Sequence, residues 1–130
     1  MLRCVKPAAA FFALVITLAL PAAAQMLRNF PATALRGELQ FLQPPQVMLN
    51  GQPFRLAPGA RIRGQNNMLQ MSGALFDVKA TVHYTIEPSG LLLNVWILTA
   101  AEAAVRPWPN SAAEAKAWLF DPAAQTWTRP

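Results

Sequence analysis

The chain has 130 residues, of which 54% are hydrophobic and 13% are charged, and its formal net charge is +5. This length is typical of a single domain, and the single cysteine excludes a disulfide within the chain. One histidine and singly scattered carboxylates give none of the usual metal-ligand spacings, and the six glycines form no phosphate-binding loop. We therefore expect no metal and no cofactor.

Residues 1–24 have the pattern of a secretory signal peptide. Arg3 and Lys6 supply a positive start, an uncharged apolar stretch follows over 7–20, and small residues precede a cleavage point after Ala24. The apolar stretch is shorter than the roughly 20 residues that span a bilayer, which favours removal over a membrane anchor. We expect an exported, periplasmic protein with no transmembrane segment after processing.

Removal of this segment also removes Cys4, which lies too early to be an acylated cysteine at the cleavage point, and leaves a cysteine-free chain. Residues 25–130 hold nine basic and six acidic side chains, a net charge of +3. Such a charge is ordinary for a small soluble domain, so we expect no nucleic-acid partner.

The first predicted elements are an extended arm over 25–32 and a strand that follows it. Pro31 disfavours a helix at the preceding residue. From Thr33 the apolar residues recur with period two, and one face of the strand carries Leu35, Gly37, Leu39 and Phe41. Pro44-Pro45 ends this strand.

Asn50-Gly51 predicts a type I′ hairpin between strands at 47–49 and 52–56, because both residues tolerate positive φ. Ala57-Pro58-Gly59 predicts a second turn before a short strand at 61–63. A short apolar piece covers 68–71, and residues 72–78 stay open between a loop and a single helical turn.

Residues 79–87 alternate most regularly and predict a strand with Val82 and Tyr84 inward and His83 outward. The strand at 91–98 is apolar on both faces and therefore needs cover on each side. We expect Trp118 and Leu119, on a helix, and Trp127, in a tail with no secondary-structure signal of its own, to cover its Trp96 and Leu98 face.

Two capping boxes predict helices in the last third of the chain. Thr99 with Glu102 begins a short helix that Pro107 stops, and Ser111 with Glu114 begins a second helix over about 112–120.

Short strands and frequent turns, followed by helices, predict a mainly β fold: a small antiparallel barrel or curved sheet with one or two short C-terminal helices. Residues 33–98 form the barrel, and residues 99–130 form the helical cover and tail of the same domain.

Four segments carry a resemblance to a group of proteins: LRGEL from Leu35, VMLNG from Val47, APGARI from Ala57 and NVWIL from Asn94. They resemble small, uncharacterised exported proteins of Gram-negative bacteria, over roughly residues 33–98. The resemblance implies an OB-like barrel, and it implies no activity and no site residues.

His83, the only histidine, is expected to face solvent from the polar side of its strand. The alternative makes it the general base of a small hydrolase, paired with Asp77 or Glu87. Neither Ser72 nor Ser89 lies in a recognisable nucleophile motif, which disfavours that alternative.

Two surfaces are candidates for binding. Arginines that alternate outward could meet an anionic partner, such as a glycan carboxylate or lipid phosphate, or form a merely solvated face; these are Arg36, Arg55, Arg61 and Arg63. Three tryptophans could form an aromatic surface for a sugar or peptide, although cover for a small core is favoured; these are Trp96, Trp118 and Trp127.

Together these features favour a non-enzymatic periplasmic module that binds or scaffolds an envelope component or a protein partner. The alternatives are the His83 hydrolase and a structural homodimer formed through the Trp96 face. No residue is assigned a catalytic role.

Overall fold

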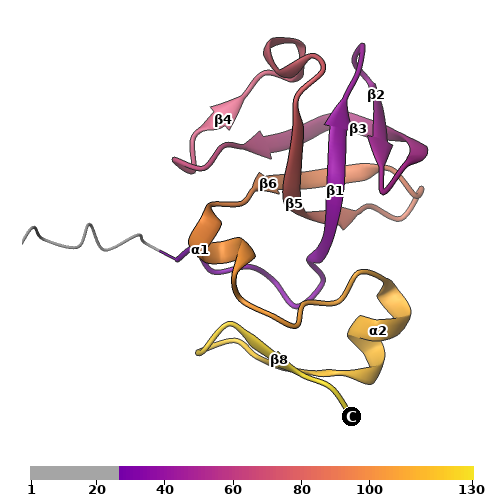
Figure 1. Cartoon of the computed structure of the whole chain (residues 1–130). Coiled ribbons are helices and arrows are strands. Elements are labelled where there is room, and N and C mark those ends of the chain that lie inside the picture. Colours follow the sequence, from indigo (N-terminus) through magenta and orange to yellow (C-terminus); the bar gives the residue numbers. More distant parts are fainter. Residues whose placement is uncertain (1–26) are drawn as a thin grey trace, which may run out of the picture.

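The structure, a computed structural model, describes residues 27–130 (Figure 1). The predicted signal peptide, Cys4 and the first two residues of the predicted arm lie outside the described residues. Residues 27–34 contain neither strand nor helix.

Five strands close into a barrel: β1 (Leu35–Phe41), β2 (Gln46–Leu49), β3 (Gln52–Arg63), β5 (Lys79–Ile86) and β6 (Leu92–Ile97). The ring runs β1-β2-β3-β6-β5 and returns to β1, and the short β4 (Leu69–Gln70) extends β3 outside it. The predicted mainly β barrel is confirmed. Four of the five strand contacts in the ring are antiparallel, as expected, whereas β3 and β6 are parallel. A closed ring with an odd number of strands cannot alternate direction at every contact, so one pair must be parallel.

Period-two patterning fills the inside of this barrel. Leu35, Leu39 and Phe41 on β1 are buried with the inward residues of the other strands, including Val82, Leu92 and Val95. The remaining inward position of β1 is Gly37. A Cβ there would lie 3.0 Å from both Asn50 Oδ1 and Leu49 Cδ1, so glycine permits the close approach of the β2–β3 hairpin.

The Asn50-Gly51 hairpin is confirmed, with φ angles of 51° and 77°. The turn predicted at 57–59 is wrong, because β3 continues through it. A register shift against β6 lies between Leu56 and Arg61, and Gly59 has a φ of 77°. This irregularity lets one long strand bend from its β2 partner to its β6 partner, which closes the barrel.

Residues 72–78, left open by the sequence, begin with a single 3-10 turn, η1 (Ser72–Leu75). The first capping box is confirmed, since Thr99 and Glu102 exchange both hydrogen bonds at the start of α1 (Ala100–Ala103). At α2 (Ala112–Ala117), Ser111 accepts from the Glu114 amide, but the Glu114 carboxylate accepts from the amide of Asn110.

α2 ends before the predicted residue 120, because the chain then forms a hairpin of β7 (Leu119–Asp121) and β8 (Thr126–Thr128). The tail, which carries no secondary-structure signal of its own in the sequence, therefore contains the strand β8. Leu119 was expected to face the core and is 76% exposed, since it has left the helix for β7.

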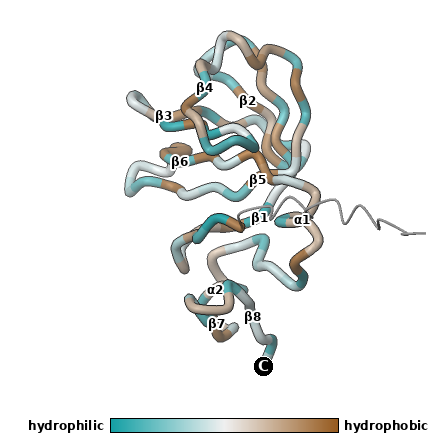
Figure 2. The backbone as a smooth tube through the Cα atoms, turned by 90° about the vertical axis from the view of Figure 1, so that its left-hand side faces the viewer, coloured by the Kyte–Doolittle hydropathy of each residue, from teal (hydrophilic) through white to brown (hydrophobic). Residues whose placement is uncertain are grey.

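The C-terminal module, residues 99–130, packs against one end of the barrel (Figures 1 and 2). A second hydrophobic cluster joins it to the barrel and the N-terminal arm, and its buried members are Phe30, Ala34, Leu98, Trp108 and Trp127. Trp96 and Trp118 pack against the cluster partly buried. The expected cover of the Trp96 and Leu98 face by the tail is confirmed.

Candidate functional site

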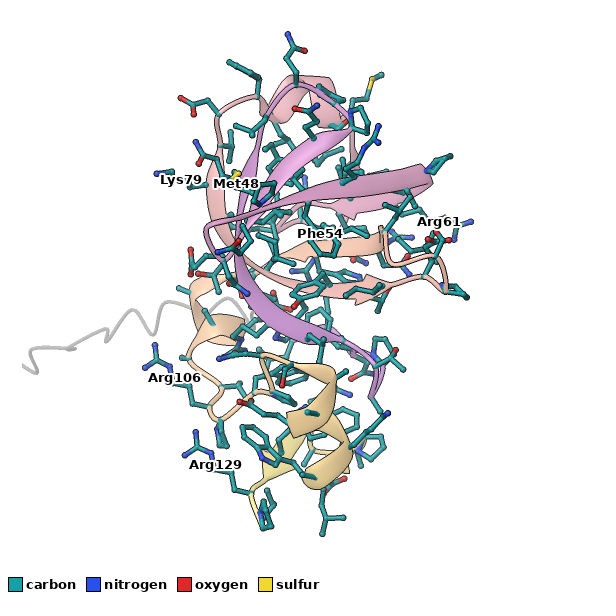
Figure 3. The ribbon with its side chains drawn as sticks, turned by 90° about the vertical axis from the view of Figure 1, so that its right-hand side faces the viewer. Met48, Phe54, Arg61, Lys79, Arg106 and Arg129 are labelled. Carbon is teal, nitrogen blue, oxygen red and sulfur yellow. The ribbon has the colours of Figure 1, made fainter. Side chains whose placement is uncertain are left out.

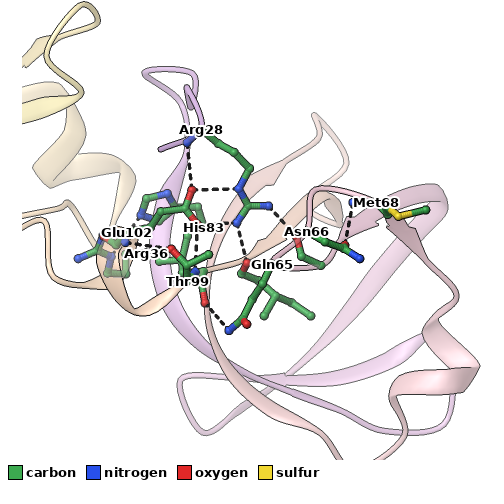
Figure 4. Close-up of polar contacts among 11 residues, drawn as sticks. Arg28, Arg36, Gln65, Asn66, Met68, His83, Thr99 and Glu102 are labelled. Carbon is green, nitrogen blue, oxygen red and sulfur yellow. Dashed lines mark hydrogen bonds and ion pairs between the residues drawn. The ribbon is translucent and has the colours of Figure 1, made fainter. Parts of the chain in front are cut away.

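A buried ion pair joins the N-terminal arm to α1 (Figure 4). Arg28 donates to the carboxylate of Glu102 from Nη2 at 2.6 Å and from Nε at 2.9 Å. Its remaining donors reach the carbonyls of Gly64 and Ile97. Burial raises the pKa of the Glu102 carboxyl, but hydrogen bonds from Arg28 and from the Thr99 backbone outweigh burial and hold the pKa below its usual value. This is the only ion pair within residues 27–130.

Arg36 links β1 to the end of α1 through hydrogen bonds. It donates to the carbonyl oxygens of Val105 at 2.7 Å, Glu102 at 3.0 Å and Ala103 at 3.3 Å. The last carbonyls of an α-helix have no partner within the helix, and the side chain of an arginine can donate hydrogen bonds to them. Burial lowers the pKa of Arg36, and the nearby charge of Arg106 lowers it further.

His83 lies directly opposite Arg36 on the neighbouring strand β5 and is only 1% exposed. Its ring stacks on Trp108 with centroids 4.1 Å apart and meets the edge of Phe30 at 4.4 Å. The expectation of a solvent-facing histidine is wrong, because the arm and the C-terminal module cover this face of β5. Burial first, and the charge of Arg36 second, lower the pKa of His83 to about 3.

The hydrogen bond from Arg36 Nε to His83 Nε2, 3.2 Å long, makes Nε2 an acceptor. The imidazole is therefore neutral and carries its proton on Nδ1. Nδ1 is buried and has no hydrogen-bond partner in the described part of the chain.

The groups suggested for a hydrolase are not brought together around this histidine. Asp77 accepts a hydrogen bond from Gln40, while Glu87 accepts from Ser89 and from the backbone of Leu91. A buried imidazole whose Nε2 is occupied by a guanidinium is unsuited to accept a proton from a substrate in solvent.

A groove of about 630 Å³ lies between the barrel and the C-terminal module. β1 and β5 contribute Arg36, Glu38 and Thr81, and the C-terminal module contributes Trp108, Arg106 and Arg129. Figure 3 shows Arg106 and Arg129 on the same side of the molecule. Of the described residues that line the groove, three are arginines and one, Glu38, is a carboxylate.

The polar groups of this groove differ in how far they are engaged. Glu38 accepts a hydrogen bond of 2.6 Å from the Thr81 hydroxyl. Arg129 lies over the ring of Trp118, 5.2 Å from its centroid. Neither the Arg106 nor the Arg129 guanidinium has a hydrogen bond or ion pair to another residue between 27 and 130, so within this part of the chain their donors are free.

The four arginines singled out in the sequence do not form one site. Arg36 belongs to β1 and lines the groove, whereas the other three lie on β3, which is not a neighbour of β1 in the barrel. On β3, Arg55 lies opposite β2, and Arg61 and Arg63 lie beside β6. Sequence reasoning missed Arg106 and Arg129, which are far apart in a charge-balanced tail and carry no local signal.

The tryptophans are placed mainly as packing residues. Trp127 is buried, and the partly buried Trp96 meets Phe30 of the same chain edge to face at 5.6 Å. The ring of Trp118 packs against the guanidinium of Arg129.

Among residues 27–130, no group of three or more metal-ligating side chains could hold a metal ion. The helices of this region are too short and too polar to cross a membrane. No protein-family model, curated protein or solved structure matches the chain.

Proposed function

We propose that this protein is a non-enzymatic binding module that holds an anionic group of an envelope component in the groove between barrel and C-terminal module. The observation that carries the proposal is the convergence of Arg36, Arg106 and Arg129 on a groove with one carboxylate. Its volume of about 630 Å³ is suitable for a small ligand or for one group of a larger ligand.

The charges around the groove favour an anion. Glu102 is paired with Arg28 and offsets the charge of Arg36 only in part, and His83 is neutral. Arg106 adds a like charge close enough to lower the pKa of Arg36. A bound carboxylate or phosphate would relieve this repulsion and accept the free guanidinium donors in a charge-assisted, two-pronged contact.

Compartment and barrel type are part of the same proposal. The signal-like residues 1–24 support export to the periplasm of a Gram-negative cell, with cleavage after about Ala24. The ring order β1-β2-β3-β6-β5, with one parallel pair, supports an OB-like barrel, a fold that often binds ligands.

The anionic group could belong to an acidic glycan or to a lipid headgroup, and titrations separate the two sources. The protein is titrated with an oligomer of galacturonate and, separately, with glycerol 1-phosphate, and binding is followed by calorimetry. Saturable binding to one of these, weakened by the double variant R106Q/R129Q, is expected. Loss of two charge-assisted contacts weakens binding at least about tenfold.

The matched control is R55Q/K79Q, which removes two exposed charges outside the groove. It is expected to bind as the unmodified protein does. Equal affinity of R106Q/R129Q and the unmodified protein would overturn the proposal, as would an equal loss in the control.

A further inference from the structure

An apolar cluster on the outer edge of β3 and β4 is not used by the groove. Met68, Leu69 and Met71 are 63%, 62% and 81% exposed, and they follow one another around the short edge strand β4. Large apolar side chains grouped in this way on a small domain mark an interaction surface.

Two arginines lie within the same patch. Arg63 is the antiparallel partner of Leu69, so both side chains project from the same side of the sheet. The Arg63 guanidinium bends over the turn and donates to the carbonyl of Asn67 at 3.1 Å, next to Met68. Arg61 is two residues earlier on β3, on the same face, and is exposed. We name Arg61, Arg63, Met68, Leu69 and Met71 the β3–β4 face.

The strands that carry the β3–β4 face contain no acidic residue. The sequence has no acidic residue between Glu38 and Asp77, a stretch that contains the end of β1, all of β2, β3 and β4, and η1. A second copy of this chain would place arginines against arginines in a symmetric contact, because such a contact joins the same patch on both subunits. The natural complement is a partner that is anionic at its surface and apolar beneath it.

We propose that the β3–β4 face docks on an anionic lipid bilayer. The three apolar side chains enter the boundary between headgroups and acyl chains, while Arg61 and Arg63 contact lipid phosphates. Figure 3 shows Arg61 on the opposite side of the molecule from Arg106 and Arg129. In Figures 1 and 2, β4 also lies at the end of the barrel remote from α2 and β8. Docking would therefore leave the groove open to its ligand, and this inference does not depend on the proposed function.

Hydrogen exchange read by mass spectrometry localises the contact. The protein is incubated with vesicles of phosphatidylethanolamine and phosphatidylglycerol, or with vesicles of phosphatidylcholine alone. We expect protection confined to peptides that cover residues 61–71, and only with the anionic vesicles. Protection that excludes these peptides, or that is equal on neutral vesicles, would overturn the proposal.

Variants then test the two halves of the face in vesicle sedimentation. R61Q/R63Q is expected to lower the partition coefficient roughly 30-fold, from about 1 kcal/mol for each charge near the surface. L69S/M71S is expected to lower it at least about tenfold, since both side chains leave water on docking. The controls are R55Q/K79Q for charge and L119S for exposed apolar area, because Leu119 lies on β7 in the C-terminal module.

All substituted positions are exposed or half-exposed, and circular dichroism checks that each variant is folded. Retained binding in both test variants would refute the assignment. A concentration-dependent dimer that L69S/M71S abolishes, without vesicle binding, would instead assign the face to a second copy and equally refute it.

Discussion

The buried histidine predicts a specific dependence of stability on pH. His83 is the only histidine, and the pKa of its side chain falls from 6.5 in the unfolded chain to about 3 in the folded protein. Between these values the unfolded state binds a proton that the folded state excludes. The free energy of unfolding must therefore decrease as the pH falls through 6.5, and the decrease ends near the folded pKa.

The magnitude follows from the two pKa values. Between about pH 7 and about pH 5, they give a loss of roughly 2 kcal/mol in the free energy of unfolding. Glu102 adds nothing in this window. Its folded pKa is lowered, so its contribution is complete above its unfolded value of 4.5 and is lost only as the pH falls below that value.

Urea unfolding at several pH values across this window measures the effect, and the variant H83Q identifies its source. Glutamine accepts a hydrogen bond from Arg36 but does not titrate, so H83Q is expected to be less stable at pH 7 and nearly independent of pH down to about 5. A flat profile in the unmodified protein would refute the reasoning. A slope that survives in H83Q would refute it as well, since another group would then be responsible.

Three further substitutions test the packing around the site by urea unfolding. E102Q should lose about 3–5 kcal/mol, because it leaves a buried guanidinium without its counterion; a loss below about 1 kcal/mol would contradict this. G37A should lose about 1–3 kcal/mol, because its Cβ meets the β2–β3 hairpin at 3.0 Å, whereas G73A meets nothing and should be within about 0.5 kcal/mol of neutral. W108F should lose about 1–3 kcal/mol more in the free energy of unfolding than W127F. Nε1 of Trp108 donates to a backbone carbonyl at 2.9 Å, whereas Nε1 of Trp127 is buried without a partner among the described residues. Equal losses in the two variants would contradict this.

Local patterns predicted the barrel strands well. The alternation over 35–41 and 79–87 identifies β1 and β5, because one face of each is committed to the core. Asn50-Gly51 identifies the hairpin because the turn type requires positive φ at both residues. These features depend on neighbours in sequence, so the sequence alone contains them.

Features that depend on distant contacts were not predictable in this way. The sequence predicts a polar outer face for β5, and His83 on this face is buried only because Phe30 of the arm and Trp108 pack against its ring. The turn expected at 57–59 became part of β3, because pairing with both β2 and β6 outweighed the local turn signal. In the tail, strand pairing between β7 and β8 overrode the helical pattern after Ala117.

The candidate site was predicted only in part. Arg36 was a candidate for an anion-binding surface, but its place in the lining of the groove depends on its contacts with α1, which the sequence does not reveal. Arg106 and Arg129 are 23 positions apart in the printed sequence, and only the fold of the C-terminal module brings both to the same groove.

The most direct test of the anion-binding groove is an NMR titration that follows the side-chain Nε–H signals of the arginines. On addition of galacturonate oligomer or glycerol 1-phosphate, the signals of Arg106 and Arg129 should shift together and saturate, and that of Arg55 should stay in place. Shifts restricted to the β3 arginines, or shifts that never saturate at the groove, would contradict the account.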